Sequence, residues 1–135
     1  MQYVTTKEQS ERLRLLLKPD TCDFFYPVTE DGISLPPRLR TIAWTDLENH
    51  GNIPCWSAGK LMEAFPVLEI RGMEYRFNIR HSSDSWVVSY KDIHNTETLW
   101  WHKHEYLVEC LVSAIERLVK EQRLTINMLN RAFSL

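Results

Sequence analysis

Hydrophobic and polar residues alternate along the middle of this chain. Every second residue is apolar across 73–80, and the same alternation returns across 86–91 after a polar run that favours a turn. A period of two is typical of strands that bury one face. The pattern therefore predicts two long antiparallel strands joined by a short turn.

Shorter signals extend this pair on both sides. Leu68 and Ile70 predict a preceding strand, and Arg71-Gly72 predicts a tight turn or bulge because the alternation changes phase there. Residues 94–99 predict a short fourth strand. Together these segments predict a meander of three or four strands.

The spacing then changes to that of an amphipathic helix, expected to begin within 102–105 and to end near residue 121. One apolar stripe comprises Leu107, Leu111, Ala114 and Leu118, and a neighbouring stripe comprises Val108, Val112, Ile115 and Val119. An apolar arc this wide buries against more than one neighbour. The sheet is one expected neighbour, and the other is either the N-terminal helix or a second subunit.

The N-terminal half predicts shorter elements. Thr5 or Thr6 can cap a first helix, and Ser57 can cap a second that Pro66 stops. Between them, 27–52 is irregular, with a possible short strand at 41–44 and a helical turn capped by Thr45 or Asp46. The tail, 124–135, predicts a short final helix.

These elements predict one α+β domain over 1–135: an antiparallel three- or four-stranded meander packed on a long C-terminal helix, with N-terminal helices around it. The length of 135 residues suits a single domain, and 44% hydrophobic residues suffice for a core. With 16 Lys and Arg against 18 Asp and Glu, the net charge of −2 disfavours a protein that acts mainly on a phosphate backbone.

The composition also bears on the cellular setting. No run approaches the roughly 20 apolar residues of a membrane span, and the first residues lack the pattern of a signal peptide. The three cysteines show no paired spacing, which favours reduced thiols. We therefore expect a cytoplasmic protein with no membrane contact.

Two motifs invite a catalytic or metal-binding interpretation. His102 and His104 stand two residues apart, but no third ligand has a recognised spacing, so we expect no metal and no cofactor. Cys55 lies just before the second predicted helix, with His50 and His94 as unplaced bases. A cysteine-dependent enzyme is thus an alternative, although we expect no enzyme, since no catalytic set or nucleotide loop is present.

Basic and aromatic residues suggest a binding surface instead. Arg76 and Arg80 share one face of a strand, and Arg71 lies at the preceding turn, which keeps nucleic-acid binding open as a second alternative. The element order resembles that of double-stranded-RNA-binding domains, but the Lys-rich start of their last helix is absent. Trp100 and Trp101 are adjacent, so one of them should remain exposed for a partner.

Several short segments together resemble a family of uncharacterised small proteins of gut Bacteroidales genomes and their prophages. They are Thr6-Lys7-Glu8-Gln9-Ser10, Thr21-Cys22-Asp23, Ile53-Pro54-Cys55-Trp56-Ser57 and Trp86-Val87-Val88-Ser89-Tyr90. The resemblance implies a phage-related or mobile-element setting in the cytoplasm, and it implies no activity. The leading hypothesis is a non-enzymatic accessory protein that associates with itself or with another protein.

Overall fold

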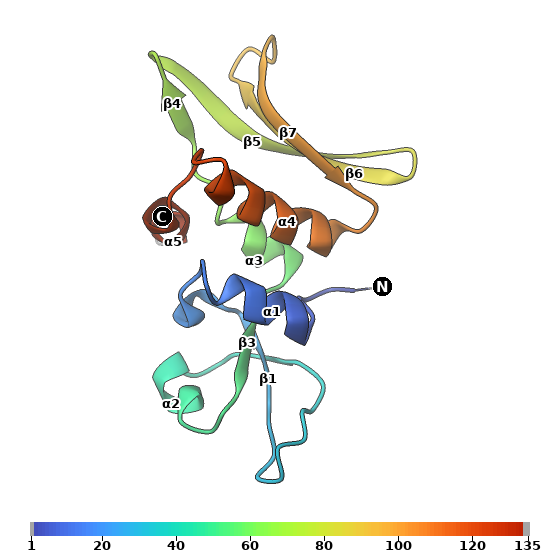
Figure 1. Ribbon diagram of the computed structural model, residues 1–135, viewed down its shortest axis with the longest axis vertical. Helices are drawn as coiled ribbons and strands as arrows, with labels where there is room; N and C mark the ends of the chain where they lie inside the picture. Colours follow the sequence, from blue (N-terminus) through green and yellow to red (C-terminus); the bar gives the residue numbers. More distant parts are fainter. Residues whose placement is uncertain (1, 134–135) are drawn as a thin grey trace.

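The computed structural model describes residues 2–133 and stacks the elements in layers along its long axis (Figure 1). A four-stranded sheet lies at one end with helix α4 against it. Helices α1 and α3 occupy the middle, and a smaller sheet with helix α2 forms the other end (Figure 1). The predicted α+β class, with an antiparallel meander packed on a long C-terminal helix, is confirmed.

The large sheet has the order β4-β5-β6-β7, with every neighbouring pair antiparallel. Its strands are β4 (Leu68–Ile70), β5 (Met73–Ser82), β6 (Ser85–Asp92) and β7 (Thr98–His104). The β4–β5 turn is formed by Arg71 and Gly72, both with positive φ, as the phase change in the sequence predicted. Alternate residues on β5 and β6 face α4, and these include Tyr75, Val88 and Tyr90, all buried.

The fourth strand exists, but its predicted position was wrong. It runs from Thr98 to His104, whereas residues 93–97 form the turn that precedes it. Asp92 organises this turn, since its carboxylate accepts hydrogen bonds from the main-chain nitrogens of Thr96 (2.7 Å) and Glu97 (2.9 Å). An Asx-type turn here delays the strand by several residues.

Helix α4 (Leu107–Lys120) therefore begins later than the sequence predicted. The segment 102–104 belongs to β7, where Trp100, His102 and His104 follow a period of two. Seven residues of α4 are buried: Val108, Cys110, Leu111, Val112, Ala114, Ile115 and Leu118. The Cys110 thiol contacts the main-chain oxygen of Trp86 at 3.5 Å, so this helix packs on β6 as predicted.

Both apolar stripes of α4 are covered within the same chain. The helix contacts β6 and β7 on one side and α1 (Lys7–Leu13) and α3 (Ala58–Met62) on the other. Leu13 of α1, Leu61 of α3 and Leu129 of α5 (Ile126–Ala132) are all fully buried in the shared core. The uncovered helix surface from which self-association was expected is thus absent among residues 2–133.

Polar contacts hold α1 against α4. Thr6 caps α1 in a reciprocal capping box with Gln9. The Gln9 side chain also donates to Glu109 of α4 at 2.6 Å, and Arg12 pairs with both Glu109 and Glu116. These contacts attach α1, near the N-terminus, to α4, near the C-terminus.

The irregular segment 27–52 contains β2 and α2, and the strands β1 and β3 flank it on either side. The small sheet has the order β2-β1-β3, formed by β1 (Phe24–Tyr26), β2 (Arg38–Leu39) and β3 (Ile53–Cys55). The short strand predicted at 41–44 is absent, because Trp44 begins α2 (Trp44–Glu48), which has no side-chain cap. A short 3-10 helix, η1 (Pro19–Thr21), follows α1.

Helices α3 and α5 each begin directly after a residue whose polar side chain caps the helix. Ser57 caps α3, and Thr125 caps α5 by accepting a hydrogen bond from the main-chain nitrogen of Met128. The predicted final helix is confirmed over Ile126–Ala132, while residues 134 and 135 of the tail lie outside the described part of the chain. Among the helices of residues 2–133, none is both long and apolar enough to cross a lipid bilayer.

Candidate functional site

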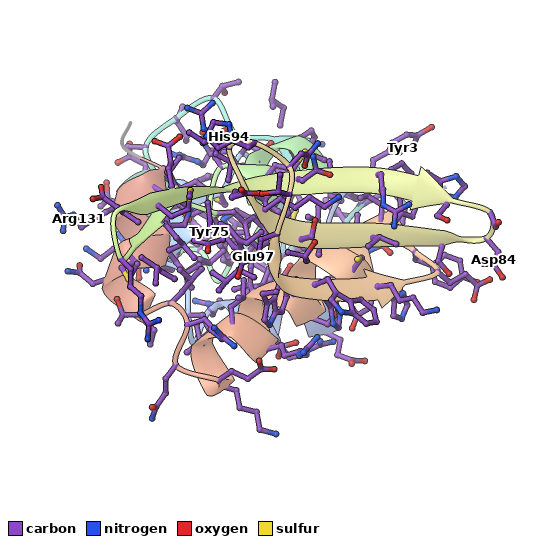
Figure 2. All side chains as sticks on the ribbon, turned by 90° about the horizontal axis from the view of Figure 1, so that it is seen from above. Tyr3, Tyr75, Asp84, His94, Glu97 and Arg131 are labelled. Atoms are coloured by element: carbon purple, nitrogen blue, oxygen red, sulfur yellow. The ribbon has the colours of Figure 1, made fainter. Side chains whose placement is uncertain are left out.

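The face of the large sheet turned away from α4, here called the outer face, carries three sets of directly opposed residues. They are Arg76–Lys91–Thr98, Asn78–Ser89–Trp101 and Arg80–Val87–Lys103, each running across β5, β6 and β7. Neighbouring strands lie about 4.8 Å apart, and successive same-face residues on one strand lie roughly 7 Å apart. The outer face therefore gathers four basic side chains around one tryptophan. Figure 2 looks onto these strands.

Most of the positive charge on the outer face has no acidic partner. Arg80, Lys91 and Lys103 form no ion pair within 4 Å among residues 2–133. Arg76 is the exception, since its Nε lies 2.7 Å from a Glu74 carboxylate oxygen. Arg71 lies in the β4–β5 turn, away from the three sets. Of the three predicted arginines, the sheet thus places Arg76 and Arg80 together and leaves Arg71 apart.

The two adjacent tryptophans face opposite sides of β7. Trp100 is 4% exposed in the core, whereas Trp101 is 56% exposed on the outer face. Trp101 lies opposite Ser89, beside the Arg80–Val87–Lys103 set. The expectation that one of the pair stays exposed is confirmed, and the exposed ring is on the same surface as Arg80.

A shallow hollow of about 610 Å³ covers one end of the outer face and reaches the β5–β6 turn. It is lined by Arg80, Ser82, Ser83, Asp84, Ser85, Val87, Ser89, Lys91, Thr98, Trp101 and Lys103. Figure 2 shows Asp84 at the tip of the β5–β6 hairpin, beyond the broad part of the sheet. Three basic residues against one acidic residue make this hollow electropositive.

No family model, curated protein or solved structure matches this chain. The resemblance to small proteins of gut Bacteroidales and their prophages accordingly stays a prediction.

The geometry does not assemble the cysteine site considered as an alternative. Cys55 lies on β3 rather than at the start of a helix, and its side chain is fully buried. Burial raises the pKa of the Cys55 thiol well above its usual range, which disfavours the reactive thiolate. His50 and His94 are both exposed, and neither forms a hydrogen bond with Cys55 among the described residues.

His102 and His104 each form hydrogen bonds within the protein. Within residues 2–133, no group of three or more His, Cys, Asp or Glu side chains is placed to hold a metal ion. His104 Nδ1 accepts a hydrogen bond from the main-chain nitrogen of Tyr106 at 3.0 Å. His102 belongs to β7, and its ring contacts α4. Its Nε2 lies 2.8 Å from Ser113 Oγ, and its Nδ1 lies 3.3 Å from an Arg117 nitrogen.

The His102–Ser113 contact resembles a catalytic pair, but its proton arrangement is that of a structural bond. Arg117 can only donate, so Nδ1 of His102 accepts and Nε2 carries the proton. Ser113 Oγ in turn donates to the main-chain oxygen of Glu109 at 2.6 Å. The imidazole therefore donates to the serine and does not act as a base toward it.

Sequence reasoning named the arginines and the tryptophan pair together as a possible interaction surface. It missed Lys103, Asn78 and Ser89 as members of the same surface. The signal was present, because Trp101 and Lys103 alternate with the inward-facing Trp100, His102 and His104. Placing this segment at a helix start hid that alternation.

Proposed function

We propose that this protein is a non-enzymatic module that binds single-stranded nucleic acid on the outer face of its four-stranded sheet. The observation that carries the proposal is the shared surface of Trp101, Arg80 and Lys103. Exposed aromatic rings on an open sheet stack unpaired bases, and Lys or Arg beside them contact phosphates. The outer face offers both kinds of side chain in neighbouring cross-strand sets.

The shape of the surface favours a single strand over a duplex. Bases inside a duplex are stacked on one another and cannot lie on a ring such as Trp101, whereas unpaired bases can. Asn78 lies in the same cross-strand set as Trp101, with Ser89 between them; it is exposed and can exchange hydrogen bonds with a base edge or a sugar hydroxyl. A shallow, open hollow also leaves both ends of a strand free to continue.

The net charge of −2 disfavours binding to a phosphate backbone, but the positive charge of this protein is concentrated locally on the outer face. Binding responds to the local field, and three basic groups on the outer face form no ion pair within residues 2–133. Acidic residues near this sheet include Glu69 and Glu74, which lie opposite each other on β4 and β5, Glu97 just before β7, and Asp84 at the hairpin tip. Because the basic set is small, we expect modest affinity that falls steeply with salt.

The proposal takes up the nucleic-acid alternative that the sequence left open and keeps the expectation of a non-enzymatic accessory protein. A phage or mobile-element setting, which the resemblance implies, is compatible with it. An acidic protein surface is the competing partner, since it also complements lysine and arginine. Binding measurements with an oligonucleotide and with an acidic peptide distinguish these two partners.

The test is fluorescence anisotropy with a labelled mixed-sequence single-stranded oligonucleotide. Trp101→Ala should weaken binding about five- to 150-fold, the equivalent of roughly 1–3 kcal/mol for one stacked base. Arg80→Gln and Lys103→Gln should each lower the slope of log affinity against log salt by about 0.7. Tyr106→Ala and Arg123→Gln are the matched controls, because both residues are exposed and lie outside the hollow.

Unchanged binding in Trp101→Ala and in Arg80→Gln/Lys103→Gln would contradict the proposal. So would saturable binding of a polyglutamate peptide together with no binding of the oligonucleotide, which would assign the outer face to an acidic protein. Tighter binding of a duplex than of the single strand would also overturn it. All of the substituted side chains are exposed, so the variants should fold normally.

A further inference from the structure

A second, smaller hollow lies where η1 and α3 meet α5. Its volume is about 320 Å³, and its lining includes four basic side chains, Lys18, Arg40, Lys60 and Arg131, against the single carboxylate of Asp20. Figure 2 shows Arg131 at the opposite end of the view from Asp84, so this hollow is separate from the outer-face site. Like charges repel one another, so four basic side chains around one small space need a physical reason.

The positive charge of Arg40 is fixed in place without an acidic partner. Its guanidinium donates to the main-chain oxygens of Cys22 (2.8 Å), Asp20 (2.9 Å) and Ile42 (3.0 Å). These bonds restrict the side chain to one orientation, and Arg40 forms no ion pair within 4 Å in the part of the chain that the structure describes. The group is therefore held in position before a ligand arrives.

The other three basic residues differ in whether a nearby carboxylate neutralises their charge. Lys60 lies 3.3 Å from a Glu63 carboxylate and 5.5 Å from the centre of the Phe133 ring. Lys18 and Arg131 form no ion pair within 4 Å among residues 2–133. Among residues 2–133, three of the four basic side chains thus form no ion pair, and Asp20 is the single acidic residue of the lining.

A buried amide holds the two walls together. Asn130 is 9% exposed, and its Oδ1 accepts a hydrogen bond from the main-chain nitrogen of Lys18 at 2.7 Å. Its Nδ2 donates to the main-chain oxygens of Leu16 (2.9 Å) and Ile126 (2.8 Å). The segment that carries Lys18 and the helix that carries Arg131 are therefore linked through one side chain.

We infer that this hollow binds a compact phosphate anion, such as a phosphomonoester or pyrophosphate group. Arginine and lysine together complement the several oxygens of a phosphate, and Thr21 and Asn127 add hydrogen-bonding groups to the lining. The small volume and the polar lining suit a compact anion more than a large apolar ligand. The inference rests on residues that the nucleic-acid proposal does not use.

The test is titration of the isotope-labelled protein with pyrophosphate, followed by amide NMR shifts at constant ionic strength. The expected result is a saturable shift at Thr21, Asn127 and Arg131. Lys18→Gln/Arg131→Gln should weaken it by about tenfold for each lost charge-assisted contact. Arg123→Gln, which replaces an exposed arginine outside the hollow, should leave it unchanged.

Two results would overturn the inference: no saturable shift at these amides with the wild-type protein, or equal affinity in the double variant. The NMR shifts of the wild-type protein test the phosphate-binding inference even if the double variant folds poorly. Arg80→Gln/Lys103→Gln should retain pyrophosphate binding, so failure of the sheet proposal and failure of this one are distinguishable. Shifts that are confined to the outer face would count against this hollow.

Discussion

Trp100 and Trp101 show how one residue step changes the role of a side chain. Successive side chains of a strand point to opposite faces. Trp100 is accordingly buried against α4, where its indole nitrogen donates to Glu121 at 3.2 Å and Arg117 lies 4.9 Å from its ring centre. Trp101 faces outward with most of its ring free. The same residue type therefore serves packing at one position and a surface at the next.

The core of α4 provides the first prediction. Leu111 is fully buried between the sheet and the N-terminal helices, so Leu111→Ala should lower the free energy of unfolding by about 2–5 kcal/mol. Leu15→Ala is the matched control, because Leu15 is 78% exposed and should change stability by less than about 0.5 kcal/mol. Denaturant melts of both variants make the comparison. Equal losses would show that α4 does not carry the core.

A second prediction concerns the pH dependence of stability through His102. Burial lowers the pKa of His102, and the neighbouring charges of Arg117 and His104 lower it further, while Glu121 and Glu109 oppose them. The unfolded chain then binds the proton more readily than the folded one. Stability should therefore fall as pH drops through the unfolded value of about 6.5 and level off below the lowered folded pKa.

His102→Gln serves as the comparison for this pH effect. The variant removes the titrating ring, so its free energy of unfolding should lose less than that of the wild-type protein between about pH 8 and pH 5. Denaturant melts at several pH values measure both slopes. Parallel slopes would mean that His102 protonates equally in the folded and unfolded chains.

At the level of elements, α5 is held by the buried side chain of Leu129 and by the buried amide of Asn130. Asn130 joins α5 to residues 16–18 by two hydrogen bonds, and a third connects it to Ile126 within α5. Asn130→Ala should lower stability by about 1–3 kcal/mol, because it leaves main-chain groups without partners, and hydrogen exchange of α5 amides should accelerate. Asn127→Ala, on the exposed side of the same helix, should have an effect below about 0.5 kcal/mol. Equal exchange rates in both variants would contradict this attachment.

Elements were predictable where local chemistry alone specifies them. Thr6 and Ser57 cap helices through their own side chains, and the alternation of β5 and β6 is long enough to be unambiguous. The β6–β7 connection was misplaced, because its turn depends on Asp92 accepting hydrogen bonds from residues four and five positions ahead. The small β2-β1-β3 sheet was not predicted as a unit, since it joins residues far apart in the chain.

At the level of the whole molecule, the apolar surface of α4 is fully used by the chain itself. Self-association was expected because two stripes seemed too wide for one sheet, and α1, α3 and α5 cover the remainder. We therefore expect a monomer in the absence of ligand. Light scattering over a concentration series should give a constant mass near 16.0 kDa. A mass that doubles with concentration would point to the outer face or another exposed patch as a dimer surface.

The sequence by itself determined the α+β class, the meander, the long helix and the burial of its stripes, because each follows from local periodicity and capping. It also identified Arg76, Arg80 and an exposed tryptophan as surface candidates. It did not determine that these residues share one face with Lys103.

Only the tertiary structure decided that arrangement. Which residues lie opposite one another depends on the register of β5, β6 and β7, and register follows from turn geometry and from packing against α4. The same holds for the hollow around Arg40 and Arg131, whose walls come from distant segments joined by Asn130. Surfaces built from non-local contacts have no periodicity in the sequence, and for that physical reason they became visible only in the folded chain.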